Sequence, residues 1–296
     1  MNRLKIKMIN YYFLQIGLIF VINLFPASLK SQHHAPLNQS DTLTSQEILY
    51  TYPTPDELLD VIEKEDLNFN NQYLNPVGNV NQYINTRTKN LNLGIYLADL
   101  AYAAFFTKRN QIAKYVDVIS KTSDDLLISA ETKTRMKEDL LQNMDNLDSI
   151  YHLTNVYYYD IMQELEYNNS HSLMVIISAG TYIESIYLAI SLVDKFSDEN
   201  ELIKQIAGQK NAFVSLLNTS KLYEKDYNVK EVIPYLEQII ALYNQFKVED
   251  KGKLIFIKNP DGTVRFKSAE KVVMNNKQFN SFRNTIREIR NKITLN

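Results

Sequence analysis

Apolar residues recur at the three- and four-residue spacing of one helix face over most of this 296-residue chain. This spacing predicts helices over about 91–106, 108–121, 129–167, 172–193, 200–219, 229–246 and 277–293. The residues expected to face inward in three of them are Leu140, Met144, Leu147, Tyr151, Tyr158, Ile161 and Leu165; Ile233, Leu236, Ile240 and Tyr243; and Phe279, Phe282, Ile286 and Ile289.

Polar residues and prolines mark several of the expected helix starts. Thr54, followed by Pro55 and Glu57, has the pattern of an N-terminal cap, and Ser129 is placed to cap the long segment that follows it. Pro234 falls within the first two turns of its helix, where a missing N–H does least harm. These residues support the helical assignment independently of the spacing of apolar residues.

A strand pattern lies near the C-terminus. Two apolar runs at 254–257 and 264–266 flank Asn-Pro-Asp-Gly at 259–262, a sequence suited to a tight turn. We therefore expect one small β-hairpin over about 253–267, marginal in stability unless it packs on the helices. The polar, Asn-rich segment 67–79 has the composition of a surface loop.

The N-terminus has the layout of a secretory signal peptide. Arg3, Lys5 and Lys7 precede an apolar run over 8–25, and small residues follow, which places cleavage between Ala27 and Ser31. An uncleaved membrane anchor is the alternative, because the run is just long enough to span a bilayer. Contact with the membrane is expected only through this segment, if it stays uncleaved.

The chain is therefore divided into a signal peptide at 1–28, a flexible leader at 29–52 and a single helical domain at 53–296. Removing the first 31 residues removes four basic residues and no acidic one, so the net charge changes from −2 to −6. A mildly acidic exported protein is a poor candidate for nucleic-acid binding, which depends on Lys and Arg at the phosphates. The expected location is the periplasm or cell envelope of a Gram-negative bacterium.

Composition excludes several chemistries. The chain has no Cys and no Trp and only 7 Gly, so disulfides, thiol nucleophiles and Cys-ligated metals are excluded. It contains no P-loop, no dinucleotide-binding glycine motif and no G-x-S-x-G elbow. His152 and His171 form no spaced ligand pair and are expected at the surface or its boundary. We therefore predict no cofactor, no metal and no catalytic residue.

Two predicted helices are unusually apolar, and each carries a single acid. These are 91–106 with Asp99 and 173–193 with Glu184. The second helix is long enough to span a membrane, but an acid at its centre argues for a buried core helix instead. The two segments also resemble each other around Gly94 and Gly180, which would fit a duplicated helix pair.

The two acids admit two interpretations. In the first, each carboxylate is held by a Tyr hydroxyl or by Arg87, Arg135 or Arg290, because a buried charge must be paired. In the second, Asp99 and Glu184 form the polar floor of a pocket between helices. The walls of that pocket would be Tyr96, Tyr102, Tyr182 and Tyr187. A hydrolase would need both carboxyl groups in one cleft.

The residues 91–102 (LNLGIYLADLAY), 179–188 (AGTYIESIYL) and 282–293 (FRNTIREIRNKI) resemble a family of exported all-helical proteins, often lipoproteins, of Bacteroidota. The resemblance covers about 50–294. It implies a shared fold and export and no particular activity. Because the chain has no Cys, it departs from the lipoprotein members.

These observations predict an all-α protein, a multi-helix bundle or helical-pair array of about seven or eight helices with one small C-terminal β-hairpin. The first functional hypothesis is an exported cell-envelope protein that binds a small ligand or a protein partner without catalysis. The alternatives are a structural or accessory subunit of an envelope complex and a hydrolase that uses Asp99 and Glu184.

Overall fold

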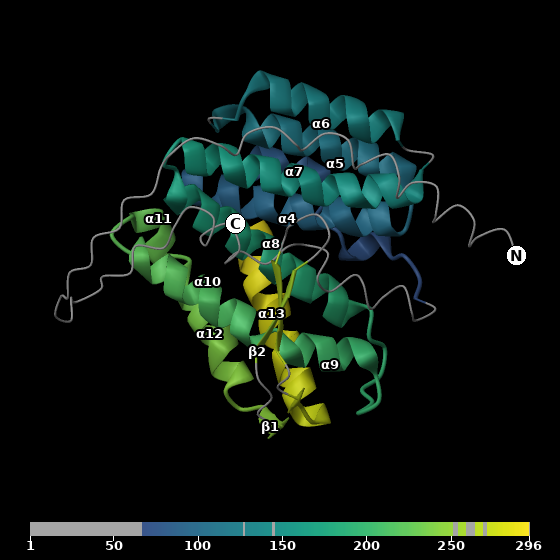
Figure 1. Ribbon diagram of the computed structural model, residues 1–296, viewed down its shortest axis with the longest axis vertical. Helices are drawn as coiled ribbons and strands as arrows, with labels where there is room; N and C mark the ends of the chain where they lie inside the picture. The colour runs from purple at the N-terminus through teal and green to yellow at the C-terminus, as the bar shows by residue number, and fades with distance from the viewer. Residues whose placement is uncertain are drawn as a thin grey trace, which may run out of the picture. The chain divides into compact units, whose positions relative to one another are not determined.

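The computed structural model of this protein describes residues 67–295, apart from 127, 144–145, 251–253, 259–263 and 269–270 (Figure 1). The predicted signal peptide, the leader and the helix start at Thr54 lie outside the described residues. The described residues all fall within one compact unit of the chain. Their fold is all-α with a C-terminal antiparallel hairpin, which confirms the predicted class.

Each of the seven helical segments predicted between 91 and 293 contains helix in the structure. The helices are α4 Thr86–Phe105, α5 Arg109–Thr122, α6 Ala130–Gln142, α7 Leu147–Tyr167, α8 His171–Ser191, α9 Glu201–Gly208, α10 Lys210–Leu222, α11 Tyr227–Lys230, α12 Ile233–Tyr243 and α13 Asn276–Thr294. Three short 3-10 turns, η2 Asn71–Tyr73, η3 Val77–Gln82 and η4 Ser123–Asp125, connect or precede them.

The prediction of one continuous helix over 129–167 is wrong. Ser129 caps α6 as expected, accepting a hydrogen bond from the backbone N–H of Thr132 at 3.1 Å. The helix then stops at Gln142, and Asn146 caps α7 by accepting from Ser149 N–H at 3.3 Å. Asn side chains compete for local backbone groups in this way, so they end one helix and begin the next.

The segments 200–219 and 229–246 are also each divided in two. α10 follows α9 at Gln209, and the single-turn helix α11 precedes α12. Pro234 lies in the first turn of α12, as its sequence position predicted. Ile239 rather than Ile240 is fully buried there. Leu236, Ile239 and Tyr243 recur at three- and four-residue spacing, so Ile240 falls at the edge of the buried face.

The predicted hairpin forms, and the strands on either side of it in the sequence pair as a separate two-stranded sheet. β2 Leu254–Lys258 pairs antiparallel with β3 Val264–Ser268, with Phe256 opposite Phe266. β1 Lys247–Asp250 pairs antiparallel with β4 Lys271–Val273, a pairing that the apolar pattern did not predict.

The helices α4 and α8 form the centre of the described fold. In Figure 1 they lie between α5, α6 and α7 on one side and α10, α12 and α13 on the other. Their backbones touch at Gly94 and Gly180: a Cβ on Gly94 would lie 2.0 Å from the carbonyl oxygen of Ile177, and one on Gly180 would lie 2.0 Å from that of Leu91. Both positions therefore require glycine, which lets the two helices approach closely.

Both central helices are buried on all sides over most of their length. Within the described part of the chain, α8 is the helix that is long and apolar enough to cross a membrane, and 94% of its most apolar window is buried inside the protein. A buried core helix meets the same criterion as a membrane span. The residues of α13 predicted to face inward, Phe279, Phe282, Ile286 and Ile289, are all buried.

Candidate functional site

The crossing of α4 and α8 brings the two predicted acids together. Asp99 and Glu184 are both 0% exposed; the charge of Glu184 raises the pKa of Asp99, and the two carboxyl groups also affect each other's pKa through a hydrogen bond. Arg290 of α13 completes the group: its Nε donates to Glu184 Oε2 at 3.0 Å and its Nη2 donates to Oε1 at 3.1 Å. We call these three residues the buried acid cluster.

Of the three arginines predicted as possible partners of the buried acids, Arg290 is the one that pairs with Glu184. Arg87 pairs instead with Glu231 at 3.2 Å, and Arg135 pairs with Asp160 at 2.7 Å. The two parallel N–H···O bonds from Arg290 to one carboxylate are the geometry in which Arg holds a buried anion most firmly. This pairing is the structural interpretation of Glu184 that the sequence analysis put first.

The surroundings raise the pKa values of the two carboxyl groups to different extents. Burial and the Glu184 carboxylate raise the pKa of Asp99 well above its usual range, and the cation of Arg290 only partly opposes this. Burial also raises the pKa of Glu184, and the charge and hydrogen bonds of Arg290 only partly oppose this rise. We infer that Asp99 is the protonated partner, so that one anion and one cation remain and the cluster is neutral. A buried pair of carboxyl groups with one proton avoids an unpaired charge.

Asn75, from the Asn-rich segment 67–79, closes the cluster on one side. Its backbone N–H donates to Asp99 Oδ2 at 3.0 Å, and its carbonyl oxygen accepts from the Tyr115 hydroxyl at 2.7 Å. Its side-chain amide donates to the Tyr83 hydroxyl and to Asn92 Oδ1, each at 3.1 Å. The prediction of a surface loop is therefore wrong at this residue, which is 0% exposed. The polar groups of Asn75 form hydrogen bonds inside the protein. Amino-acid composition alone does not show whether an Asn bonds to buried groups or to water.

Two of the four predicted wall tyrosines, Tyr96 and Tyr187, lie near the buried acid cluster, and the other two bond to residues outside it. Tyr96 lies near the cluster, where its hydroxyl donates to the Pro76 carbonyl oxygen at 3.3 Å, and the guanidinium of Arg290 lies 4.7 Å from the ring centre of Tyr187. The Tyr102 hydroxyl accepts from Asn70 N–H at 3.0 Å, and burial raises the pKa of Tyr102 to about 12. Tyr182 bonds to Gln209 instead. A ligand role for any of them stays a prediction.

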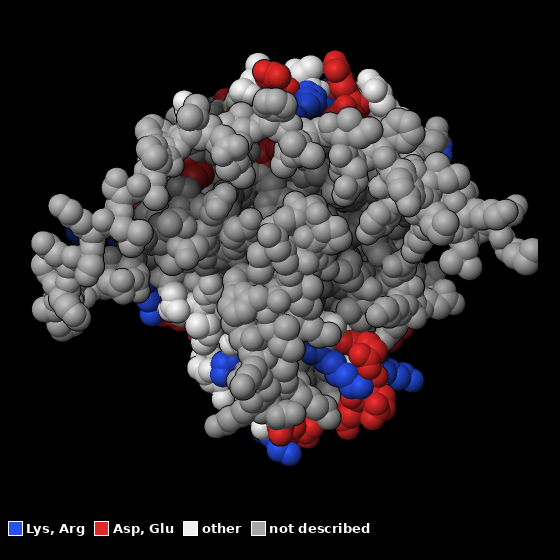
Figure 2. All heavy atoms as spheres, in the orientation of Figure 1, with Lys and Arg blue, Asp and Glu red and all other residues white. Residues whose placement is uncertain are grey.

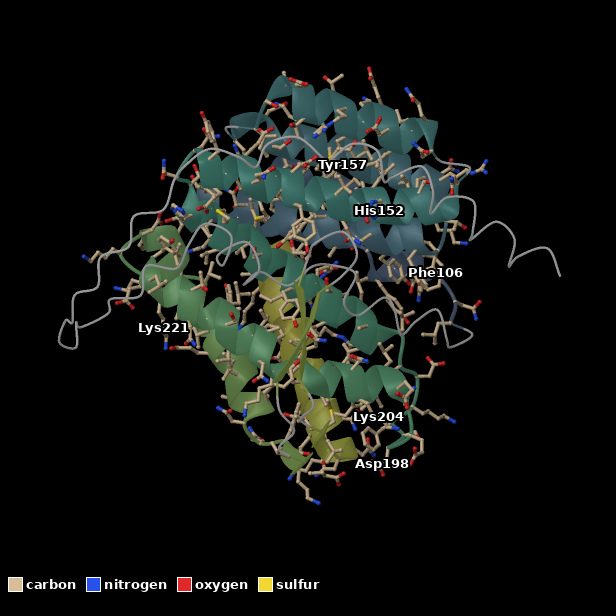
Figure 3. All side chains as sticks on the ribbon, viewed as in Figure 1. Phe106, His152, Tyr157, Asp198, Lys204 and Lys221 are labelled. Carbon is tan, nitrogen blue, oxygen red and sulfur yellow. The ribbon has the colours of Figure 1, made fainter. Side chains whose placement is uncertain are left out.

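The two helical histidines lie where the sequence placed them. His152 is exposed on α7, and His171 is the half-buried first residue of α8 (Figure 3). His171 stacks on Tyr223 and lies 3.2 Å from the Glu166 carboxylate. Among the described residues, no group of three or more His, Cys, Asp or Glu side chains is placed to hold a metal ion.

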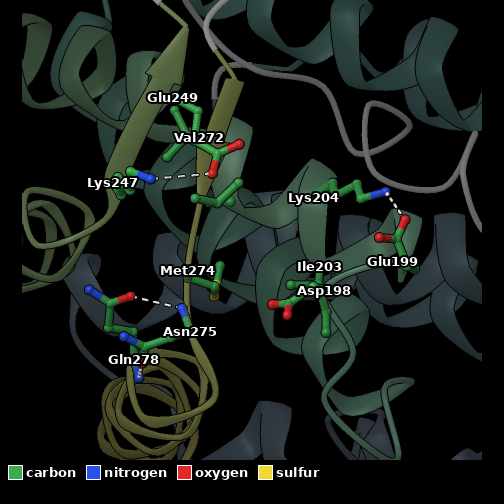
Figure 4. A pocket seen from close by; sticks show the side chains of 12 residues that line it. Asp198, Glu199, Ile203, Lys204, Lys247, Glu249, Val272, Met274, Asn275 and Gln278 are labelled. Atoms are coloured by element: carbon green, nitrogen blue, oxygen red, sulfur yellow. Dashed lines mark hydrogen bonds and ion pairs between the residues drawn. The ribbon is translucent and has the colours of Figure 1, made fainter.

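An open pocket of about 460 Å³ lies elsewhere, between α9, the β1–β4 strand pair and the start of α13 (Figure 4). Its floor is apolar and buried: Ile203 and Ala207 come from α9, Val272 from β4 and Met274 from the residue after it. This volume falls within the ~300–1,000 Å³ of typical small-molecule sites. We call this cavity the α9–β4 pocket.

The rim of the α9–β4 pocket is charged. Asp198, Glu199 and Lys204 lie on the α9 side, and Lys247 and Glu249 lie on β1. Figure 2 shows acidic and basic side chains mixed at the lower end of the described surface, the end at which Figure 3 labels Asp198 and Lys204. Sequence reasoning missed this pocket, because surface charges at 198–204 and 247–249 have no distinctive spacing. None of the six residues predicted for a pocket lines it.

The fold and this geometry define an all-α protein with a sealed ionic cluster at its centre and an open pocket beside its hairpin. No protein-family model, no curated protein and no solved structure matches the chain.

Proposed function

We propose that this chain is an exported cell-envelope protein that binds a small ligand in the α9–β4 pocket without catalysis. The observation that carries the proposal is the pocket itself, with its buried apolar floor and charged rim. Ligand sites commonly combine apolar walls with a few polar groups in this way. The N-terminal basic and apolar segments support export, as does the resemblance to exported proteins of Bacteroidota.

Burial of the acids favours binding over the hydrolase alternative. A hydrolase must present its two carboxyl groups to a substrate. Asp99 and Glu184 are 0% exposed, and Arg290 occupies both oxygens of Glu184. The α9–β4 pocket is open and holds no residue of this cluster.

The pocket is tested by a thermal-shift screen of small molecules on the full chain, followed by a blocking variant. Val273→Trp places a large side chain in the pocket lining from a half-buried strand position. We expect compounds that raise the melting temperature of the wild type to lose that effect in Val273→Trp. The matched control is Ile84→Trp, at an apolar position that is 83% exposed and is not part of the lining.

Two outcomes would contradict the proposal. One is a screen without a stabilising compound, and the other is a set of hits that act equally on Val273→Trp. Export is tested separately, by fractionating a Gram-negative host that expresses the full chain or a chain without residues 1–28. We expect the full chain in the envelope or periplasm and the shortened chain in the cytoplasm.

A further inference from the structure

Both lysines at the rim of the α9–β4 pocket are already paired. Lys204 lies 3.0 Å from Glu201 and 3.3 Å from Glu199, and Lys247 lies 3.5 Å from Glu249. Figure 4 shows the bonds to Glu199 and Glu249 as dashed lines. The hydrogen bonds that Lys204 donates to Glu201 and Glu199 raise its pKa, so Lys204 stays charged beside these two carboxylates. Each rim lysine therefore already has a carboxylate partner.

Part of the hydrogen-bonding capacity at the start of α13 is already used, although helix N-termini attract anions in general. Asn275 and Gln278 satisfy each other in a capping box: the Asn275 side chain accepts from Gln278 N–H at 2.9 Å, and the Gln278 side chain accepts from Asn275 N–H at 2.8 Å. The Gln278 amide nitrogen donates to the Gln245 carbonyl oxygen at 2.6 Å. The backbone N–H groups of the two residues that line the pocket here, Asn275 and Gln278, are thus both bonded.

Asp198 is the third acidic residue at the rim and the one that pairs with neither rim lysine. It is exposed, and it has no hydrogen bond or ion pair with any residue in the described part of the chain. The described lining carries three acids and two lysines, a net charge of −1. The electrostatic balance at the rim therefore favours a positive group, while the floor of Val272, Met274 and Ile203 favours an apolar one.

We propose that the α9–β4 pocket takes an organic cation with an apolar stem, in which a primary ammonium group pairs with Asp198 and the stem lies on the apolar floor. This inference rests on the proposed function and specifies the ligand class of the same site. It predicts that charge, at constant stem length, decides which compounds bind.

Three six-carbon probes separate the contribution of the head-group charge to binding from that of the apolar stem. They are hexylammonium, hexanol and hexanoate, each titrated into the full chain by NMR. We expect hexylammonium to bind about fivefold more tightly than hexanol, the upper range for an exposed ion pair, and hexanoate to bind more weakly than either. Asp198→Asn should reduce hexylammonium affinity about threefold to fivefold and leave hexanol unchanged. Raising the salt concentration should produce the same selective loss.

Glu138→Gln is the matched control. It removes one exposed carboxylate from α6, away from the pocket lining, and should change none of the three affinities. If no probe binds, both the pocket function and the cation preference are wrong. If all three bind equally in the wild type and in Asp198→Asn, or if hexanoate binds best, the pocket function stands and the cation preference is wrong.

Discussion

Asp99 and Glu184 have the same functional group but different surroundings in the core. Glu184 accepts two hydrogen bonds from the guanidinium of Arg290, whereas Asp99 accepts one from the Asn75 backbone, and the neighbouring Glu184 carboxylate raises the pKa of Asp99. The sequence suggested that both are buried acids in need of partners. Only the structure shows that Glu184 is the counter-ion of Arg290, and from the raised pKa of Asp99 we infer that Asp99 is neutral.

This difference predicts unequal costs for two conservative substitutions. Glu184→Gln leaves Arg290 without its anion, and we expect it to lower the free energy of unfolding by about 3 kcal/mol or more. Asp99→Asn keeps an oxygen for the Asn75 N–H and supplies an amide N–H toward Glu184, so we expect a loss of less than about 1 kcal/mol. Urea unfolding of both variants measures the difference. Equal losses in the two variants would contradict the assigned roles.

At the scale of the helices, the close crossing of α4 and α8 determines where the acids meet. Gly94 and Gly180 are each pressed against the carbonyl of a residue in the facing helix, Ile177 and Leu91 respectively. The two segments that resemble each other in sequence thus also pack alike, because the glycine of each helix contacts a backbone carbonyl of the other. The contact explains why these two positions carry glycine even though glycine destabilises a helix interior.

The crossing predicts that Gly94→Ala is strongly destabilising. The added Cβ would lie 2.0 Å from a backbone oxygen, so the helices must separate, and we expect a loss of about 3 kcal/mol. Gly208→Ala is the control, because it also adds a methyl group within a helix but meets nothing within 4 Å. It should be neutral or stabilising by up to about 1 kcal/mol. Similar melting temperatures for the two variants would show that the crossing is less close than described.

For the whole molecule, the buried acid cluster connects parts that lie far apart in the sequence. Asn75 precedes the first described α-helix, Asp99 and Glu184 belong to the central pair, and Arg290 lies in α13 near the C-terminus. The hydroxyl of Tyr83 adds a bond to the Thr294 carbonyl oxygen at 3.0 Å. Folding of the described chain therefore brings both of its ends to one polar group, which makes global stability sensitive to that group.

The raised pKa of Asp99 predicts how this stability changes with pH. Above about pH 4, the unfolded chain has lost the Asp99 proton while the folded chain retains it. The folded state then binds more protons, so the free energy of unfolding falls as the pH rises toward the folded pKa, by up to about 1.4 kcal/mol per pH unit. Asp99→Asn has no such proton, so its unfolding free energy should fall less than that of the wild type between pH 5 and 8. Parallel curves for the two proteins would refute the assignment of the proton.

The apolar spacing and the hairpin turn were sufficient to predict the fold class, the burial of α13 and the helical nature of each segment. These properties depend on neighbours three or four residues apart, which the sequence shows directly. The breaks near Gln142 and Gln209 were not predicted, because local side-chain caps compete with helix continuation by small energies. The burial of Asn75 was not predicted because an amide bonds equally well to water and to buried groups.

The sequence alone therefore determined that this protein is a cysteine-free helical domain whose two most apolar helices each contain one acid. Only the tertiary structure decided that Arg290 pairs with Glu184, that burial raises the pKa of Asp99 and that the open pocket lies beside β4 rather than at the acids. Pairing, protonation and cavities arise between residues that are up to about two hundred positions apart in the chain. Such contacts depend on how the helices pack, and no local pattern of residues records that packing.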